Sequence, residues 1–446
     1  MSIILWTDLD TYLYTEYETA RNAAPNSIKV HMSAKENIVV VGAGIVGVSA
    51  AIWLLRAGKD VTLLDRTAPG EGTSYGSAGV LASCSVAPVT APGMITKAPG
   101  MLLNPNFPLF LRWSYLPKLA PWLLKYLSHA NAPETRRIAA GLAPLTTDSV
   151  EQHESLTEGT DAVRWLTRTD YSFAYKNRSA FEGDAFTWGL RRDAGFEPDI
   201  IEGPAVQEFE PLLSSDMQLL AVMRQHGVIS APGAYVKALA DEAERLGARL
   251  VRGEMRDVVL MDNKVEAIIT EDETILCDNV VIATGVWSKP LAKKLGIDVP
   301  LETERGYHIE FEPEDRVLRS PIMVTTGKFV ATPMLDGLRC AGVVEFGGLA
   351  APASNKPLAL LERTVRATFP SLRLKRRDTW LGHRPAPSDS LPLIGEIRGS
   401  GVFAAFGHHH IGLTGGPKTG RIIADVIAHG GINMDLTPYD PNRFGG

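Results

Sequence analysis

Cysteine is scarce in this sequence, and no CxxC pair is present. The three cysteines, Cys84, Cys277 and Cys340, lie far apart along the chain. Three is too few for a disulfide scaffold, and their spacing does not fit a zinc ribbon. The cysteine content therefore favours a reducing compartment, and we expect a cytoplasmic protein.

Long uninterrupted hydrophobic runs are also missing. The most apolar stretch, 107–127, contains Arg112, Lys118, Lys125 and three prolines. A bilayer span needs roughly twenty consecutive apolar residues, so this stretch does not read as one. Its aromatic residues and lysines fit two other interpretations equally well. It forms either a peripheral contact with the inner membrane or an aromatic pair of helices in a cap domain.

Neither sign of charge greatly exceeds the other over the whole chain. Its 446 residues carry 45 Lys plus Arg and 51 Asp plus Glu, a net charge of −6. Such a balance disfavours nucleic acid as a partner, and the length favours two domains. Residues 1–31 contain acidic residues and no basic start before an apolar core, which excludes a secretory signal. We expect Met32 to be the native start and residues 1–36 to be a dispensable extension.

A glycine motif follows the first convincing strand. The buried, β-branched run at 37–41 leads directly into Gly42, Gly44 and Gly47, and a helix of small and apolar residues follows. Asp65 ends the next strand. Glycines in this context permit a tight turn and a close approach of the backbone to a pyrophosphate, while the acidic residue accepts hydrogen bonds from a ribose. The unit predicts dinucleotide binding, and Asp65 argues against a 2′-phosphate.

Further elements follow a second loop of small residues at 72–80. The region from about 85 to 220 is richer in Pro and aromatic residues, which is typical of a separate cap or substrate domain. The pattern at 232–246 predicts an amphipathic helix ended by Gly247. A hairpin is predicted around Asp262 and Asn263, and a buried strand ending in Gly285 follows.

The motifs together resemble the FAD-dependent D-amino acid oxidase family. They are the glycine motif, Thr73-Ser74 with Ala78-Gly79, 280–288, Gly382-His-Arg-Pro385, 389–395 and 407–414, and their order and spacing are similar to the family's. The resemblance spans about residues 37 to 430 and is closest to bacterial D-amino acid dehydrogenases.

The resemblance implies an α/β fold in two interleaved parts. One is a Rossmann-type FAD-binding domain, similar to that of glutathione reductase, and the other is an α+β substrate domain built on a mixed sheet. The implied segments are 37–82, 222–290 and 381–431 for the FAD-binding domain, 83–221 and 291–380 for the substrate or cap domain, and 432–446 for a C-terminal tail.

The resemblance also implies which residues contact a non-covalently bound FAD. They are Gly42, Ala43, Gly44, Ile45, Val46, Gly47, Asp65, Arg66, Thr73, Ser74, Ala78, Gly79, Val80, Met255, Gly285, His408, His409, Ile411, Gly412, Leu413 and Thr414. Three consecutive histidines at 408–410 do not point to a metal, because neighbouring imidazoles cannot easily converge on one ion.

Arg384 is the leading candidate for binding the substrate carboxylate. The family uses the arginine of this Gly-x-Arg-Pro motif in that role, and a guanidinium forms a planar, bidentate pair with a carboxylate. The alternative interpretation is that Arg384 fixes the following turn through Asp389.

Three departures from the family pattern make the expected pocket less cationic. His410 stands where glycine oxidase has a second arginine, Phe329 where a tyrosine is expected, and Ser77 where related dehydrogenases have asparagine. Tyr307 and His308 are candidates for replacement polar contacts, although their segment also reads as an ordinary strand.

The activity implied is oxidative deamination of a D-amino acid. Hydride transfer from the α-carbon to flavin N5 would give an imine and then a 2-oxo acid. The alternatives are a glycine, sarcosine or D-hydroxyproline oxidase, or the catalytic subunit of an opine oxidase. A nucleic-acid-modifying flavoenzyme and a non-catalytic electron-transfer subunit fit less well. We expect a quinone or O₂, and not NAD or NADP, as the electron acceptor.

Overall fold

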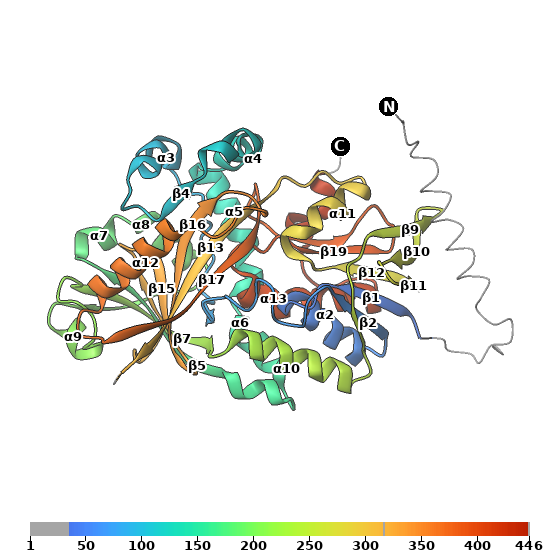
Figure 1. Cartoon of the computed structure of the whole chain (residues 1–446), viewed down its shortest axis with the longest axis horizontal. Coiled ribbons are helices and arrows are strands. Elements are labelled where there is room, and N and C mark those ends of the chain that lie inside the picture. Colours follow the sequence, from blue (N-terminus) through green and yellow to red (C-terminus); the bar gives the residue numbers. More distant parts are fainter. Residues whose placement is uncertain (1–34, 315–316, 445–446) are drawn as a thin grey trace.

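The computed structural model describes residues 35–314 and 317–444 (Figure 1). The predicted extension at 1–36 and the proposed start at Met32 therefore fall almost entirely outside the described residues. Within those two ranges, no helix is both long enough and apolar enough to cross a membrane.

The first sheet is built around β1, whose β-branched residues are buried on both faces. It has six strands in the order β18 (Leu393–Glu396), β19 (Val402–Phe406), β12 (Asn279–Ile282), β1 (Asn37–Val41), β2 (Asp60–Asp65) and β8 (Arg249–Arg252). β1 pairs in parallel with both β2 and β12. Beside this sheet lies an antiparallel sheet of β9 (Asp257–Met261), β10 (Lys264–Ile269) and β11 (Thr274–Leu276). The predicted hairpin is confirmed, with positive φ at Asp262 and Asn263.

The second large sheet is mixed and lies on the other side of the molecule (Figure 1). Its path is β17 (Leu374–Pro387), β13 (Leu301–Pro313), β16 (Gly337–Phe346), β15 (Phe329–Met334), β14 (Ile322–Val324), β5 (Leu166–Tyr175), β7 (Leu219–Ile229) and β3 (Val80–Leu81), with β4 (Leu109–Leu111) beside β16 and β6 (Asp199–Glu202) beside β7. The segments of the two large sheets alternate along the sequence. This is the predicted α/β fold class with a mixed second sheet.

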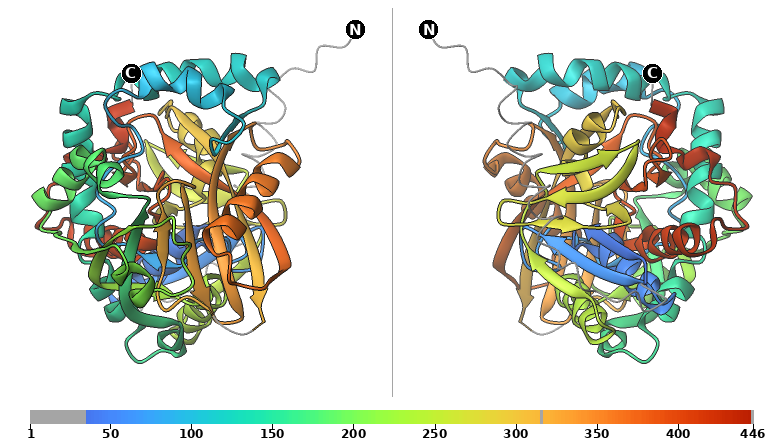
Figure 2. Two further views of the ribbon diagram at one scale, coloured as in Figure 1. Left: turned by 90° about the vertical axis from the view of Figure 1, so that its left-hand side faces the viewer. Right: turned by 90° about the vertical axis from the view of Figure 1, so that its right-hand side faces the viewer.

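Helices cover both sheets and one edge of the molecule (Figures 1 and 2). They are α2 (Ile45–Arg56), α3 (Met94–Leu103), α4 (Leu116–Ser128), α5 (Ala132–Thr146), α6 (Ser149–Thr157), α7 (Arg178–Glu182), α8 (Ala185–Asp193), α9 (Ala205–Phe209), α10 (Pro232–Arg245), α11 (Ser288–Lys294), α12 (Asn355–Thr368) and α13 (Gly412–His429). Short 3₁₀ turns are η1 (Trp113–Tyr115), η2 (Asp161–Trp165), η3 (Gly285–Trp287), η4 (Thr437–Tyr439) and η5 (Pro441–Phe444).

Two helix predictions have different outcomes. The amphipathic helix predicted at 232–246 is α10, and its apolar face is buried. The alternative of a helix pair at 107–127 is wrong, because this stretch forms β4, η1 and the single helix α4. The first part is extended because its backbone pairs with β16. Pro117 lies in the first turn of α4, where proline is tolerated.

A buried histidine joins three helices of the core and predicts acid sensitivity. The Nδ1 atom of His153 lies 2.7 Å from the Tyr235 hydroxyl, and its Nε2 atom lies 2.9 Å from the Leu413 carbonyl oxygen. The neutral ring satisfies both contacts by accepting at Nδ1 and donating at Nε2. Burial lowers the pKa of His153 to about 4, against an ordinary value of 6.5.

Between those two pH values the unfolded chain binds a proton at His153 that the folded chain does not. The contribution of His153 to the free energy of unfolding is therefore fully present above pH 6.5. It decreases by about 3 kcal/mol as the pH falls towards 4. We expect His153→Gln, which keeps a donor and an acceptor, to lose less stability over this range. Denaturant titrations from pH 7 to pH 4 measure the difference, and equal pH slopes in the two proteins would contradict it.

Candidate active site

A cavity of about 1380 Å³ is lined by residues from both large sheets and from α3 and α4. It is larger than the roughly 300–1,000 Å³ typical of a pocket for one small molecule. Its walls include the ends of β1 and β2, the starts of α2 and α13, and the adjoining parts of β13, β16 and β17. The volume therefore has room for a dinucleotide together with a second, smaller molecule.

Two helices begin at the wall of this cavity. Gly44, Ile45 and Val46 line it at the start of α2, and Gly412, Leu413 and Thr414 line it at the start of α13. Within the described residues, neither N-cap residue offers a side chain to the first-turn N–H groups. Exposed N–H groups and the positive end of the helix dipole favour an anionic group such as a pyrophosphate or a reduced flavin. The wall therefore fits FAD.

One side chain at the end of β2 and one in the 72–80 loop hold the glycine motif in place. A carboxylate oxygen of Asp65 accepts a hydrogen bond of 2.7 Å from the Ala43 N–H, and the other accepts one of 2.9 Å from the Thr67 N–H. The Ser74 hydroxyl accepts from the Ile45 N–H at 3.1 Å. A carboxylate has about four lone-pair positions, so Asp65, which lines the cavity, keeps acceptor capacity for a ribose.

Arg384 occupies the cavity face of β17, where glycine makes room for its side chain. It pairs in register with Glu304 of β13, and its guanidinium lies over Gly306. A Cβ atom added to Gly306 would be only 2.4 Å from the Arg384 Cζ atom. Gly382 has a similar role, because a Cβ atom there would meet the Trp380 ring at 1.8 Å. The glycine of the Gly-x-Arg-Pro motif is thus explained by packing.

A bulge in β16 faces the same guanidinium. The pairing of β13 with β16 shifts between Gly306 and Tyr307, and the extra residue is Val343 with φ of 61°. A β-branched residue in the left-handed region is strained. The bulge directs the Val343 carbonyl oxygen towards Arg384, whose Nη1 atom lies 3.4 Å away. This single long contact leaves most of the guanidinium's donors available to a ligand.

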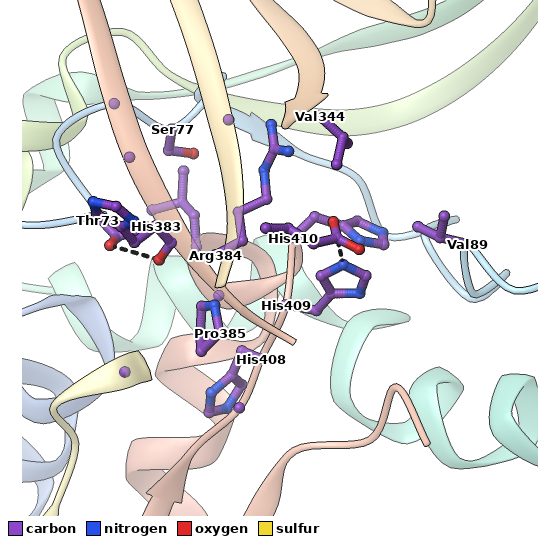
Figure 3. Close-up of a pocket in the computed structure, with 18 of the residues that line it drawn as sticks. Thr73, Ser77, Val89, Val344, His383, Arg384, Pro385, His408, His409 and His410 are labelled. Carbon is purple, nitrogen blue, oxygen red and sulfur yellow. Dashed lines mark hydrogen bonds and ion pairs between the residues drawn. The ribbon is translucent and has the colours of Figure 1, made fainter. Parts of the chain in front are cut away.

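The three histidines at 408–410 have three different environments (Figure 3). His408 is buried, with Nε2 2.8 Å from the Thr419 hydroxyl, and burial lowers its pKa to about 4. His409 has φ of 51°, and its Nε2 atom lies 2.7 Å from a Glu304 carboxylate oxygen. His410 exposes its ring to the cavity deep inside the molecule, and burial, helped by His409 and Arg384, lowers its pKa to about 3. His408 and His410 are therefore neutral at physiological pH.

The cavity brings together most of the residues singled out in the sequence. Its wall contains Gly42, Gly44, Ile45, Val46, Asp65, Arg66, Thr73, Ser74, Ala78, Val80, Met255, Gly285, Tyr307, Arg384, His408, His409, His410, Gly412, Leu413 and Thr414. Outside the wall lie Ala43, Gly47, Gly79, Ile411 and His308. Gly47 instead permits close packing, since a Cβ atom there would be 1.8 Å from the Gly42 carbonyl oxygen.

Tyr307 and His308, proposed as replacement polar contacts, are both engaged within the protein. The Tyr307 hydroxyl donates to Glu345 at 2.5 Å and accepts from the Ser354 N–H at 3.1 Å. His308 is fully buried, with Nδ1 3.1 Å from the Gly76 carbonyl oxygen and its ring stacked on Trp380. The segment forms strand β13, on which Tyr307 lines the cavity and His308 does not.

The other alternative for this region, a bond between Arg384 and Asp389, is wrong. Asp389 pairs with Arg443 at 2.8 Å, while Arg384 lies opposite Glu304. Phe329 is fully buried in the core behind the cavity, and the next residue, Val330, lines the wall.

Sequence reasoning missed several polar residues of the wall, among them Glu304, Tyr126 and Cys84. Glu304 on β13 lies directly opposite Arg384, Tyr126 comes from α4, and Cys84 follows β3. The only available signal was the alternation of β13, which puts Glu304 and Gly306 on one face. No local pattern marks Tyr126 or Cys84, because both come from segments without a motif.

Comparisons with known proteins agree with this geometry. The family model described as "DAO: FAD dependent oxidoreductase" matches residues 37–426. A protein named D-amino-acid oxidase from Bradyrhizobium diazoefficiens is 39% identical over 93% of this chain and all of its own length. A D-amino acid dehydrogenase from Rhizobium johnstonii is 28% identical over 92% of this chain and all of its own length.

A solved structure gives the same fold. The glycine oxidase of Geobacillus kaustophilus superposes with a TM-score of 0.74 over 92% of this chain and all of that chain, at 20% identity. The family model covers nearly the whole described chain, and the Bradyrhizobium relative aligns along its entire length. The chain therefore belongs to the DAO family of FAD-dependent oxidoreductases.

Proposed function

We propose that the protein oxidises the bond between the α-carbon and the nitrogen of a D-amino acid, giving an imine that water converts to a 2-oxo acid and ammonia. One observation carries this assignment: a guanidinium with free donors, Arg384, lies in a cavity whose other walls fit FAD. The names of the two relatives, D-amino-acid oxidase and D-amino acid dehydrogenase, point to the same substrate class.

The residues of the chain orient the substrate and enclose it. Arg384 binds the carboxylate through two parallel hydrogen bonds, which fixes the α-carbon relative to the cofactor. When bound, FAD supplies the two-electron acceptor for the hydride that leaves this carbon. Gly44, Ile45 and Ser74 would hold its pyrophosphate, and the N–H groups at the start of α13 would stabilise negative charge on the reduced flavin. The cavity walls exclude bulk water from the charged groups.

Anaerobic bleaching of the flavin tests the assignment. The FAD-loaded protein is mixed without oxygen with a panel of D-amino acids, their L-enantiomers, glycine, sarcosine and D-hydroxyproline. We expect rapid bleaching with D-amino acids and release of the corresponding 2-oxo acid on turnover. Bleaching by glycine, sarcosine or D-hydroxyproline alone would replace this assignment with the alternative oxidases, and bleaching by none would reject it.

The flavin is bound without a covalent bond in this proposal, although Cys84 lines the cavity. Burial raises the pKa of the Cys84 thiol to about 11, so it is protonated and a poor nucleophile at neutral pH. We expect acid precipitation to release all the yellow colour into the supernatant. Cys84→Ser should behave identically. Colour that stays in the wild-type pellet and is released in the variant would show a bond to Cys84.

The electron acceptor in this proposal is a membrane quinone. Four exposed apolar residues, Ile95, Leu103, Trp113 and Leu124, form what we name the apolar patch on α3, η1 and α4. α3 and α4 lie along one edge of the molecule (Figure 2), and other residues of the same helices line the cavity. A lipid-soluble acceptor would therefore reach the cavity from this edge.

The charge of this region favours an anionic lipid surface. Between Glu71 and Glu134 the sequence contains no acidic residue, although the whole chain is net negative. Lys118 and Lys125 of α4 are exposed. Exposed apolar side chains with neighbouring lysines are typical of peripheral contact with anionic lipid.

Vesicle sedimentation tests the contact. We expect the protein to sediment with vesicles containing phosphatidylglycerol, less with neutral vesicles, and less at high salt. The double substitution Trp113→Ser and Leu124→Ser should abolish binding, while Leu335→Ser, at an equally exposed leucine outside the patch, should not. Quinone reduction and oxygen uptake are measured in the same samples to determine whether a quinone or O₂ accepts the electrons. O₂ is the alternative because one relative is named an oxidase. Equal recovery with all vesicles would reject the membrane contact.

A further inference from the structure

Glu304 is a buried carboxylate at the cavity wall, beside the residue that binds the substrate carboxylate. Its exposed fraction is 3%, yet it lines the cavity. It lies directly opposite Arg384 in the β13–β17 register, on the same face of the sheet. Directly opposite residues of an antiparallel pair have Cβ atoms roughly 5 Å apart. A negative and a positive side chain therefore enter the cavity next to each other.

Glu304 is ionised in this position. Burial alone would raise the pKa of Glu304, but the His409 ring at 2.7 Å and then the Arg384 guanidinium hold it below its usual value. Among the described residues, no ion pair within 4.0 Å joins Glu304 to Arg384. The two opposite charges thus lie side by side without neutralising each other through direct contact.

Tyr126 of α4 brings an unpartnered hydroxyl to the same place. Its exposed fraction is 4%, and it lines the cavity. Its hydroxyl has no hydrogen-bond partner in the described part of the chain. Its ring stacks on Trp122 with 4.5 Å between the centroids, and the Trp122 Nε1–H donates to the carbonyl oxygen of Ala386, two residues from Arg384 on β17. Burial and the charge of Glu304 raise the pKa of Tyr126, in keeping with this placement. A buried hydroxyl without a partner is costly, so a ligand group is expected to satisfy it.

We propose that Glu304 and the Tyr126 hydroxyl bind the ammonium group of a zwitterionic amino acid whose carboxylate is held by Arg384. This inference rests on the proposed function and names the form of substrate that the site selects. An α-amino acid carries its two opposite charges on neighbouring atoms, which matches the adjacent Glu304 and Arg384. A carboxylate without an ammonium group is repelled by Glu304, so the site discriminates against simple carboxylic acids.

Two isosteric ligands that cannot be oxidised test the proposal directly. 2-Aminoisobutyrate is a zwitterion without an α-hydrogen, and pivalate has a methyl group in place of its ammonium group. Dissociation constants for both are measured from the change in flavin absorbance of the FAD-loaded protein. We expect the wild type to bind 2-aminoisobutyrate at least about 10-fold more tightly than pivalate.

Glu304→Gln should shift the two affinities in opposite directions. We expect binding of 2-aminoisobutyrate to weaken about 10- to 100-fold and binding of pivalate to strengthen several-fold. Glu302→Gln is the matched control, because it removes the same charge from the same strand. Glu302 accepts a hydrogen bond from the Tyr115 hydroxyl at 3.1 Å and lies outside the cavity wall. Both affinities should stay unchanged in the control.

Tyr126→Phe provides a second variant, since it removes a hydroxyl that the described residues leave unpaired and should fold normally. It should weaken the zwitterion several-fold and leave pivalate unchanged. Equal shifts of both ligands, or none, in Glu304→Gln and Tyr126→Phe would overturn the inference. So would a wild type that binds pivalate as tightly as 2-aminoisobutyrate. If these results accompany normal bleaching by D-amino acids, only the ammonium site is rejected and the proposed function stands.

Discussion

Replacement of Arg384 by alanine should reduce catalytic efficiency by roughly 10² to 10³-fold or more, while flavin content and folding stay intact. A charge-assisted, bidentate pair in a site that excludes water is worth on the order of 3 to 5 kcal/mol. The structure supports intact folding, because the one hydrogen bond of Arg384 within the described chain is 3.4 Å long. Steady-state kinetics on the best D-amino acid, flavin occupancy and melting temperature give the three readouts.

Two comparisons make this expectation specific to the carboxylate. Arg384→Lys should restore only part of the efficiency, because an ammonium is a point charge that cannot pair with both carboxylate oxygens in one plane. Amines that lack the carboxylate, already poor substrates, should be almost unaffected by either change. A purely structural arginine would instead give a flavin-depleted protein that loses activity on every substrate. Near-normal efficiency of Arg384→Ala on an amino acid would end the assignment.

The parts of the site that the sequence predicts well are those coded by consecutive residues. The glycine motif, the Thr73-Ser74 loop and the start of α13 each lie within a short segment, and each reaches the cavity wall. Their chemistry depends on backbone N–H groups and small side chains, which leave a local pattern. Arg384 is identified through the resemblance of its Gly-x-Arg-Pro motif to that of the family, and the structure shows that the glycine of this motif gives Trp380 room.

The parts of the site that the sequence could not predict depend on strand register and on packing between segments that lie far apart along the chain. Glu304 meets Arg384 only because β13 and β17 pair in one of several possible registers. The bulge at Val343 arises in the separate pairing of β13 with β16, and its residue with positive φ is a valine, which gives no local signal of a bulge. Tyr126 reaches the cavity through the docking of α4, and no motif in 107–127 indicates which of its aromatic residues faces inwards.

Replacement of Gly47 by alanine should weaken FAD binding and lower the flavin content of the purified protein. A Cβ atom at Gly47 would lie 1.8 Å from the Gly42 carbonyl oxygen and 3.3 Å from the Ala283 Cβ atom. The nearest atom belongs to the backbone, so relief requires movement of the glycine loop or of α2. Either movement displaces the N–H groups at the start of α2 from the cavity wall. Overpacking of this kind costs about 1–3 kcal/mol, equal to a 5- to 150-fold loss of FAD affinity if it falls on binding.

Gly189→Ala in α8 is the matched control, because a Cβ atom added there would meet no described atom within 4 Å apart from its chain neighbours and the nearby backbone of its own helix. The control should keep its full flavin content and melt at the same temperature or slightly higher, since alanine favours a helix. The absorbance ratio at 450 and 280 nm after purification, followed by titration of the apoprotein with FAD, measures occupancy and affinity. A Gly47→Ala protein that retains wild-type FAD affinity would show that α2 does not need its close approach to the glycine loop. The pyrophosphate would then have to be held mainly by the Thr73–Ser74 loop and the start of α13.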